Sequence, residues 1–210
     1  MSQHSKSLDQ VYGAPDPATT RQLYDDWAAR YDAENLANGF WLPMLAAGFV
    51  ARHVPLGAGP ILDAACGTGL VGRSLAVLGY ADLTGLDLSP GMLGEAGRHG
   101  VYARLLEHRL GTPAPLADGS FAAAICSGAF GPGHAPPGTL DDLVRLTAPG
   151  GAVIFNVRED SYADQGFAAA MARLTEAGRW AEVERSAEFR AFLSTEPELT
   201  VRFFVFRTAG

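Results

Sequence analysis

The sequence predicts an α/β fold built around a doubly wound, mostly parallel sheet of seven strands. Apolar runs short enough for buried strands alternate with helical segments between residues 60 and 157, which is the pattern of βαβ units. Hydrophobic residues make up 48% of the 210 residues, enough for a sizeable core. The tail then predicts two strands, over 182–193 and 199–207, that a short turn joins into an antiparallel hairpin.

The N-terminal quarter predicts a flexible segment over 1–15 and a pair of helices that form a lid within 16–53. The first helix is expected over 17–36, and Asn38-Gly39 ends it. The second is expected over 40–53. Because that segment is mostly apolar, we expect it to pack against the sheet. With no linker or repeat visible, residues 1–210 are predicted to form a single domain.

The central segment predicts each strand and helix of the sheet in turn. Strands are expected over 60–65, 83–88, 104–108, 121–127 and 152–157, and helices over 70–78, from residue 90, over 139–146 and over 162–177. Ser89 and Pro90 suit the N-cap and the first helical position. The alternation makes the five strands parallel, with the hairpin completing the sheet.

Composition limits the classes of partner and the cellular location that we expect for this protein. A formal net charge of −7 argues against nucleic acid or an anionic membrane surface as a partner. Cys66 and Cys126 belong to no CxxC pair, so no metal site is predicted, and two free thiols in a reducing cytoplasm are expected. The polar residues 1–10 do not resemble a signal peptide, and no apolar run reaches the ~18 residues of a membrane span. We therefore expect a cytoplasmic protein that binds no membrane.

The most informative segment is a glycine-rich turn that follows the strand over 60–65. Gly67, Gly69 and Gly72 match G-x-G-x-x-G, and Asp87 lies 20 residues after Gly67, at the end of the next strand. Glycine lets a backbone turn sharply and approach a ligand, and the acid can accept hydrogen bonds from both hydroxyls of a ribose. Two ligands fit this pattern, a dinucleotide and S-adenosylmethionine.

Asp63 favours S-adenosylmethionine. It precedes Gly67 by four residues, where a carboxylate would repel the pyrophosphate that a dinucleotide brings to a helix N-terminus. S-adenosylmethionine has no phosphate and carries a sulfonium and an ammonium group, which a carboxylate attracts. An NAD(P) oxidoreductase and a tight turn without a ligand are the less favoured alternatives.

These motifs resemble those of the class I S-adenosylmethionine-dependent methyltransferases, which have a Rossmann-like fold. Residues 62–69 are similar to the first motif, 85–93 to the second, 118–121 to the lead-in to the fourth strand, and 149–151 to the turn before the fifth. Within the class, residues 24–32 and the Leu-Gly pair at 110–111 resemble the Williams–Beuren-region methyltransferase-like proteins. The resemblance covers roughly residues 20–160.

The resemblance implies a cofactor site, to which the aromatic face of the first helix adds three residues. The set is Tyr24, Trp27, Tyr31, Asp63, Ala65, Cys66, Gly67, Gly69, Asp87, Leu88, Met92, Leu110, Gly111 and Ser127. The residues around the glycine turn would hold the methionine part, and Asp87 would bind the ribose diol. Leu88 and Met92 would flank adenine, and Ser127 would lie near the transferable methyl group. Leu110 stands where many relatives carry an acid, so backbone groups there would hold adenine.

Two features outside the motifs have alternative interpretations. Tyr24, Trp27 and Tyr31 repeat along one face of the first helix, which predicts a buried face, a lid whose hydroxyls and rings contact the cofactor, or both. His134 lies in the loop over 131–137, after the fourth strand, and is either an exposed histidine or a general base that contacts the substrate.

The predicted reaction moves the sulfonium methyl of S-adenosylmethionine to a nucleophilic atom of a small-molecule acceptor. The resemblance leaves open a peptide or protein acceptor, and a non-catalytic module that only binds the cofactor. A monomer or a weak dimer is expected, and the strand over 199–207 is the edge that could pair between two subunits.

Overall fold

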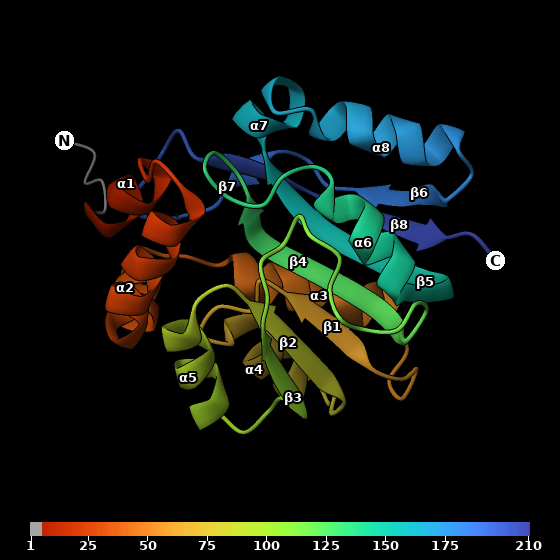
Figure 1. The fold of residues 1–210 in the computed structure, drawn as a ribbon, viewed down its shortest axis with the longest axis horizontal. Coiled ribbons are helices and arrows are strands. Elements are labelled where there is room, and N and C mark those ends of the chain that lie inside the picture. The colour runs from red at the N-terminus through yellow and green to blue at the C-terminus, as the bar shows by residue number, and fades with distance from the viewer. Residues whose placement is uncertain (1–5) are drawn as a thin grey trace.

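The computed structural model describes residues 6–210, which form one mixed sheet flanked by helices (Figure 1). The strands are β1 Ile61–Ala64, β2 Leu83–Asp87, β3 Arg104–Glu107, β4 Phe121–Phe130, β5 Thr147–Arg158, β6 Trp180–Arg185, β7 Phe189–Arg190 and β8 Thr200–Thr208. Their order is β3-β2-β1-β4-β5-β8-β6, with the two-residue β7 paired to β8. The first five are parallel, and β8 runs antiparallel to both β5 and β6. The predicted fold class is confirmed, and β7 is the strand beyond the seven expected.

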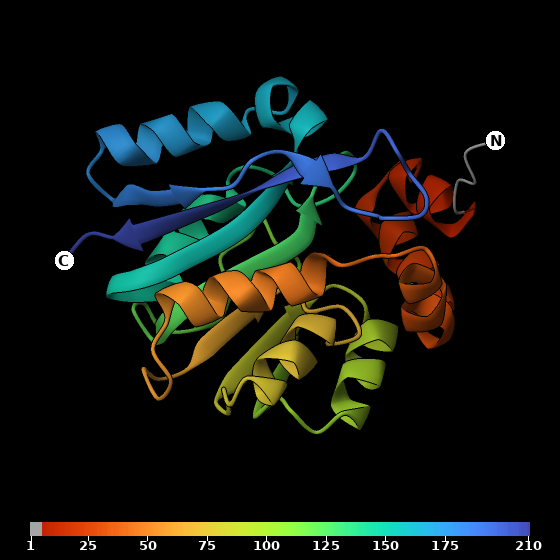
Figure 2. The same ribbon diagram turned by 180° about the vertical axis from the view of Figure 1, so that it is seen from behind.

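Helices cover both faces of the sheet. They are α1 Lys6–Tyr12, α2 Pro17–Ala37, α3 Leu42–His53, α4 Leu70–Val77, α5 Pro90–Arg98, α6 Thr139–Leu146, α7 Glu159–Asp164 and α8 Phe167–Glu176. One face carries α3 and α4 (Figure 2), and the other carries α6, α7 and α8. Asp16 caps α2, and Ser89 caps α5 by accepting from the Met92 N–H, as the sequence indicated.

Alternating strand residues build a core on each side of the sheet. Ile61 and Ile154 belong to the cluster with α3 and α4, while Leu62 and Phe155 belong to the cluster with α6 and α8. This follows from the two-residue period of a strand, since the central strands are buried on both faces. The sheet is therefore held from both sides, which fixes the carboxyl ends of its parallel strands.

The C-terminal third differs from its prediction in three places. The strand expected over 182–193 is two strands, β6 and β7, which both pair with β8. The single helix expected over 162–177 is two helices, because Gly166 adopts a left-handed backbone (φ +84°) between α7 and α8. The strand expected at the edge lies inside the sheet, between β5 and β6. Its backbone is already paired on both sides, so the suggested dimer contact through 199–207 is wrong.

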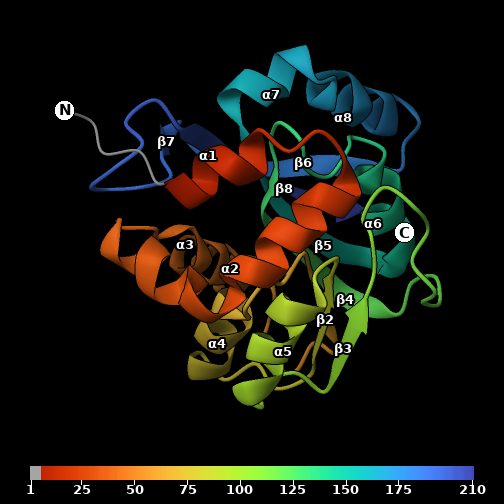
Figure 3. The same ribbon diagram turned by 60° about the vertical axis from the view of Figure 1, so that its left-hand side comes forward.

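The N-terminal lid also differs from its prediction. Lys6–Tyr12 forms helix α1 with Leu8 and Val11 buried, where a flexible segment was expected over 1–15; residues 1–5 lie outside the described part. Helix α3 packs on β4 and β5 through its apolar face instead of covering the site. Of the predicted lid, α1 and α2 lie across the end of the sheet toward which β1 and β4 point (Figure 3). Within residues 6–210, every helix is too short or too polar to span a membrane.

Candidate functional site

A cavity of about 150 Å³ lies beneath α2, at the carboxyl ends of β1, β2 and β4. The strand order reverses between β1 and β4, which is where open α/β sheets bind their ligands. Ten predicted residues line it: Tyr24, Tyr31, Ala65, Gly67, Asp87, Leu88, Met92, Leu110, Ser127 and His134. The sequence did not single out Pro17, Thr20, His108, Arg109, Gly128, Ala129, Gly133, Ala135 and Pro136, which complete the wall.

The turn after β1 forms the floor of this cavity. Ala65 and Gly67 both adopt left-handed backbones, with φ of +61° and +55°. A Cβ atom added at Gly67 would meet nothing within 4 Å, so the backbone there faces open space. The hydrogen bond from the Cys66 N–H to the Leu86 carbonyl, 2.9 Å long, holds the turn against β2. The conformation leaves room for a ligand to approach the main chain.

Asp87 is oriented by two backbone donors. One carboxylate oxygen accepts the Gly67 N–H at 2.8 Å, and the other accepts the Ser89 N–H at 2.9 Å. Burial raises the pKa of Asp87, although these hydrogen bonds act in the opposite direction. Each oxygen keeps capacity for a further hydrogen bond, so the side chain fits a diol presented from the cavity.

Two polar atoms of the wall have no partner within residues 6–210. The Ser127 Oγ is buried without a hydrogen bond. The Tyr31 hydroxyl likewise has no hydrogen bond within the described part, and burial raises the pKa of Tyr31, so the group is neutral. Buried polar groups are rarely left unsatisfied. These two atoms therefore fit a ligand that supplies the missing hydrogen bonds.

Asp63 lies below the loop and does not line the cavity. It is 1% exposed, and one oxygen accepts the Tyr102 hydroxyl at 2.6 Å while the other has no partner in the described part. Burial raises the pKa of Asp63 to about 7, and the nearby Asp87 adds to the effect. Asp63 is therefore held by Tyr102 below the cavity, and its contact with a bound cation stays a prediction.

Two glycines of the motif leave room for Tyr102. A Cβ at Gly72 would lie 2.3 Å from the Tyr102 hydroxyl oxygen, and one at Gly69 would lie 3.1 Å from its ring. The close packing places the hydroxyl on Asp63. Gly111 is likewise shaped by packing, since its Cβ would lie 2.5 Å from Pro136.

Trp27 and Cys66 belong to the packed interior. The indole N–H of Trp27 donates to Glu34 at 2.7 Å, and its ring packs against Tyr31 with centroids 4.7 Å apart. Cys66 is buried where Gly85 leaves space, since a Cβ on that glycine would lie 2.8 Å from the sulfur. Trp27, Cys66, Asp63, Gly69 and Gly111 do not line the cavity, and the cofactor contacts expected of them stay predictions.

Two carboxylates attach α2 to the floor of the site. Asp25 accepts hydrogen bonds from the Ser89 hydroxyl and from the Gly91 N–H at 2.8 Å, which joins α2 to the start of α5. Asp32 accepts from the Thr68 hydroxyl next to the glycine turn. Both lie in the segment that resembled the family, but no local pattern indicates their partners, which are 64 and 36 residues away.

His134 and Tyr24 form a hydrogen-bonded pair in the cavity wall. The His134 Nδ1 lies 2.7 Å from the Pro132 carbonyl oxygen, which can only accept, so Nδ1 carries a proton. Burial lowers the pKa of His134, which keeps the ring neutral. Its Nε2 therefore accepts the Tyr24 hydroxyl at 2.8 Å. The histidine is held in one tautomer by groups on either side of it.

A smaller second cavity, of about 30 Å³, adjoins the first. The two share Tyr24, Tyr31, Gly128 and His134, and the second extends toward α1, β5 and the segment before β8. Most of its other wall residues are apolar or aromatic, and its further polar groups are Asn35, Asn156 and Arg158. The two cavities therefore share one wall, and the second is far smaller than the first.

Comparison with known proteins places this geometry in a family. Residues 61–151 match the model of a methyltransferase domain. Human methyltransferase-like protein 27 is 37% identical over 179 residues, which are 81% of this chain and 71% of that protein. An S-adenosylmethionine-dependent methyltransferase from Mesorhizobium loti superposes with a TM-score of 0.56 at 16% identity, over 76% of this chain and 96% of its own. A putative methyltransferase in complex with the Haloferax volcanii Trm112 activator gives 0.70 at 19% identity, over 90% and 97%.

The fold and site thus define a class I S-adenosylmethionine-dependent methyltransferase, an enzyme whose cofactor is S-adenosylmethionine. Within that class, the chain belongs to the family of methyltransferase-like protein 27. The prediction of S-adenosylmethionine over NAD(P) is confirmed.

Proposed function

We propose that this enzyme transfers the sulfonium methyl group of S-adenosylmethionine to a nucleophilic atom of a small-molecule acceptor. The cofactor supplies an activated methyl group, and the protein supplies alignment, which can be worth roughly 7–11 kcal/mol. The observation that carries the proposal is the small second cavity, which shares a wall with the cofactor cavity. A cavity of this kind, which must widen to admit a ligand, suits a compact acceptor better than a peptide.

The residues that would hold the cofactor follow from the first cavity. Asp87 would bind the ribose hydroxyls, and Ala65 and Gly67 would present backbone groups to the methionine part. Leu88 and Met92 would flank adenine, and the Tyr31 and Ser127 hydroxyls fit hydrogen-bonding groups of the ligand. Helix α2, attached by its carboxylates, would act as the lid over the bound cofactor.

Label transfer from methyl-labelled S-adenosylmethionine into a cell extract tests the proposal. The extract is separated by size before the reaction, and the product is analysed by mass. We expect label in the low-molecular-mass fraction, and Asp87→Ala should bind S-adenosylhomocysteine at least about tenfold more weakly, since it loses hydrogen bonds to a charged group. Exposed Asp118→Ala is the matched control. Label found only in protein would contradict the small-molecule acceptor.

A further inference from the structure

The second cavity has walls suited to a flat ring. The Phe40 and Phe192 rings stack with centroids 4.9 Å apart and an interplanar angle of 29°, and Phe130 and Tyr12 also line the cavity. Aromatic walls favour aromatic ligands through offset and edge-to-face contacts. The free space of about 30 Å³ is too small for a ring, so Tyr12 and the short helix α1, which packs chiefly on α2, must move outward to admit one.

The pair Tyr24 and His134 stands where this cavity meets the cofactor cavity, and its hydrogen bonds have a fixed direction. The Tyr24 hydroxyl donates to the His134 Nε2, and the opposite nitrogen donates to the Pro132 carbonyl. The Tyr24 oxygen can still accept a hydrogen bond from a group in the second cavity. A proton delivered to that oxygen can therefore continue to the histidine, and the carbonyl stabilises the resulting imidazolium.

Such a relay works only if the pKa of the acceptor group is close to that of the tyrosine hydroxyl that takes its proton. A hydroxyl on an aromatic ring has the same intrinsic pKa as a tyrosine, about 10, so proton exchange with Tyr24 costs little. An aliphatic hydroxyl is far less acidic, closer to water at about 15.7. An aromatic amine is nucleophilic in its neutral form and needs no proton acceptor before it attacks. The relay therefore suits a ring hydroxyl best.

On the basis of the proposed methyl transfer, we propose that the second cavity binds an acceptor with a hydroxyl on an aromatic ring, and that Tyr24 passes its proton to His134. The hydroxyl oxygen forms a bond to the methyl carbon as the carbon–sulfur bond breaks, and the bonding electrons leave with sulfur. The hydroxyl proton moves to the Tyr24 oxygen while the tyrosine proton moves to Nε2. A methyl ether, S-adenosylhomocysteine and an imidazolium result, and the imidazolium returns its proton to solvent.

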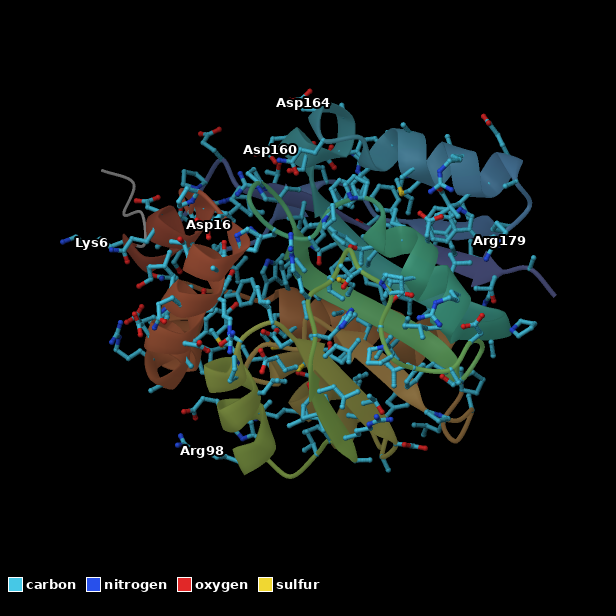
Figure 4. All side chains as sticks on the ribbon, viewed as in Figure 1. Lys6, Asp16, Arg98, Asp160, Asp164 and Arg179 are labelled. Carbon is cyan, nitrogen blue, oxygen red and sulfur yellow. The ribbon has the colours of Figure 1, made fainter. Side chains whose placement is uncertain are left out.

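The charges around the relay come from several elements. Arg158 on β5 pairs with Asp160, and its guanidinium lies 4.7 Å from the centroid of the Tyr12 ring on α1. Figure 4 labels Asp160 at the start of α7. Arg158 contributes to the lowered pKa of His134. Burial, together with Tyr12, Tyr31 on α2 and Asp87 on β2, raises the pKa of Tyr24. The relay is therefore neutral before the reaction.

Binding can be tested without turnover, by NMR of the protein saturated with S-adenosylhomocysteine. We expect p-cresol to shift the ¹⁵N resonance of the His134 Nε2, and benzyl alcohol at the same concentration to leave it unchanged. In Tyr24→Phe the p-cresol effect should disappear while S-adenosylhomocysteine still binds. Equal responses to the two probes, or no response to p-cresol in the wild-type protein, would overturn the proposal.

The kinetic test compares variants on phenols of different acidity. With p-cresol at neutral pH, Tyr24→Phe and His134→Gln should each lower kcat by about 10²-fold or more. With 4-nitrophenol in mildly alkaline buffer the acceptor is already ionised, so both variants should keep most of the wild-type rate. A structural role would slow both substrates alike. Tyr162→Phe and the exposed His99→Gln are the controls that should leave kcat unchanged.

Product analysis separates this proposal from the one on which it rests. Methyl ethers of the phenols, with aniline and benzyl alcohol unreacted, support it. Cofactor binding without any phenol methylation, or a product methylated on nitrogen or carbon, would overturn the ring-hydroxyl acceptor and leave methyl transfer to a small molecule standing. If label appeared only in protein, both proposals would be lost.

Discussion

Replacing Asp63 with asparagine should remove a pH dependence of stability that this buried carboxyl gives to the fold. Its pKa rises from 3.8 to about 7 because burial disfavours the charged form. The folded value lies above the unfolded one. The contribution of Asp63 to stability is therefore fully present below pH 3.8, and it is lost as the pH rises through about 7.

The size of the effect follows from the two pKa values. One pK unit corresponds to about 1.4 kcal/mol, so the difference between 3.8 and about 7 is worth about 4 kcal/mol. That is a large part of the 5–15 kcal/mol by which a typical domain is stable. The asparagine amide of the variant stays neutral at every pH, and its oxygen can still accept the Tyr102 hydroxyl.

Urea unfolding of both proteins, repeated in steps of pH between these two values, measures the effect. The free energy of unfolding of the wild type minus that of Asp63→Asn should fall by about 4 kcal/mol across the range. Taking the difference cancels the titrating groups that do not interact with Asp63. Circular dichroism of the variant checks that it folds. A difference that stays constant with pH would refute the assignment of a raised pKa to Asp63.

Three further substitutions test the packing and the lid. Gly72→Ala should lose about 1–3 kcal/mol of unfolding free energy, because the added Cβ meets Tyr102. The control Gly94→Ala in α5, where nothing lies within 4 Å of the added Cβ, should gain up to about 1 kcal/mol. Equal effects of the two substitutions would contradict the contact with Tyr102. Asp25→Ala frees α2 from α5 and should weaken S-adenosylhomocysteine binding by about tenfold in calorimetric titration, and unchanged affinity would argue against a lid attached there. Tyr31→Phe should weaken that binding by about tenfold without changing Tm, and a lower Tm with unchanged affinity would assign the hydroxyl to the fold.

The parts of the fold predicted correctly are those that local sequence determines. The central strands are short apolar runs, and Ser89 with Pro90 starts α5 by a capping pattern that needs no other segment. Helix α1 was missed because it is short and polar apart from Leu8 and Val11, whose burial depends on packing against distant residues. The break at Gly166 was missed because one glycine within a helical pattern has no distinct signal.

The residues of the site likewise divide into those that local sequence predicts and those that it does not. Asp87 and Gly67 were predicted from spacing, since the distance between a glycine turn and the end of the next strand is set along the chain. Tyr102 belongs to no motif, and the motif that contains Asp25 does not indicate its partners. Their roles depend on contacts between segments far apart in the sequence, such as the 64 residues that separate Asp25 from Ser89. Such contacts exist only once the sheet has brought the segments together.

The glycine motif shows how the prediction of the cofactor rests on a residue, Asp63, that does not line the cavity. Of its three glycines, only Gly67 faces open space, whereas the other two make room for the ring of Tyr102. Tyr102 in turn holds Asp63 beneath the loop, where a pKa of about 7 leaves the carboxyl partly protonated near neutral pH. A positive ligand above the loop would favour the ionised form, because opposite charges attract even without contact. The carboxylate therefore disfavours a pyrophosphate at this turn through the electric field that it sets up below the backbone.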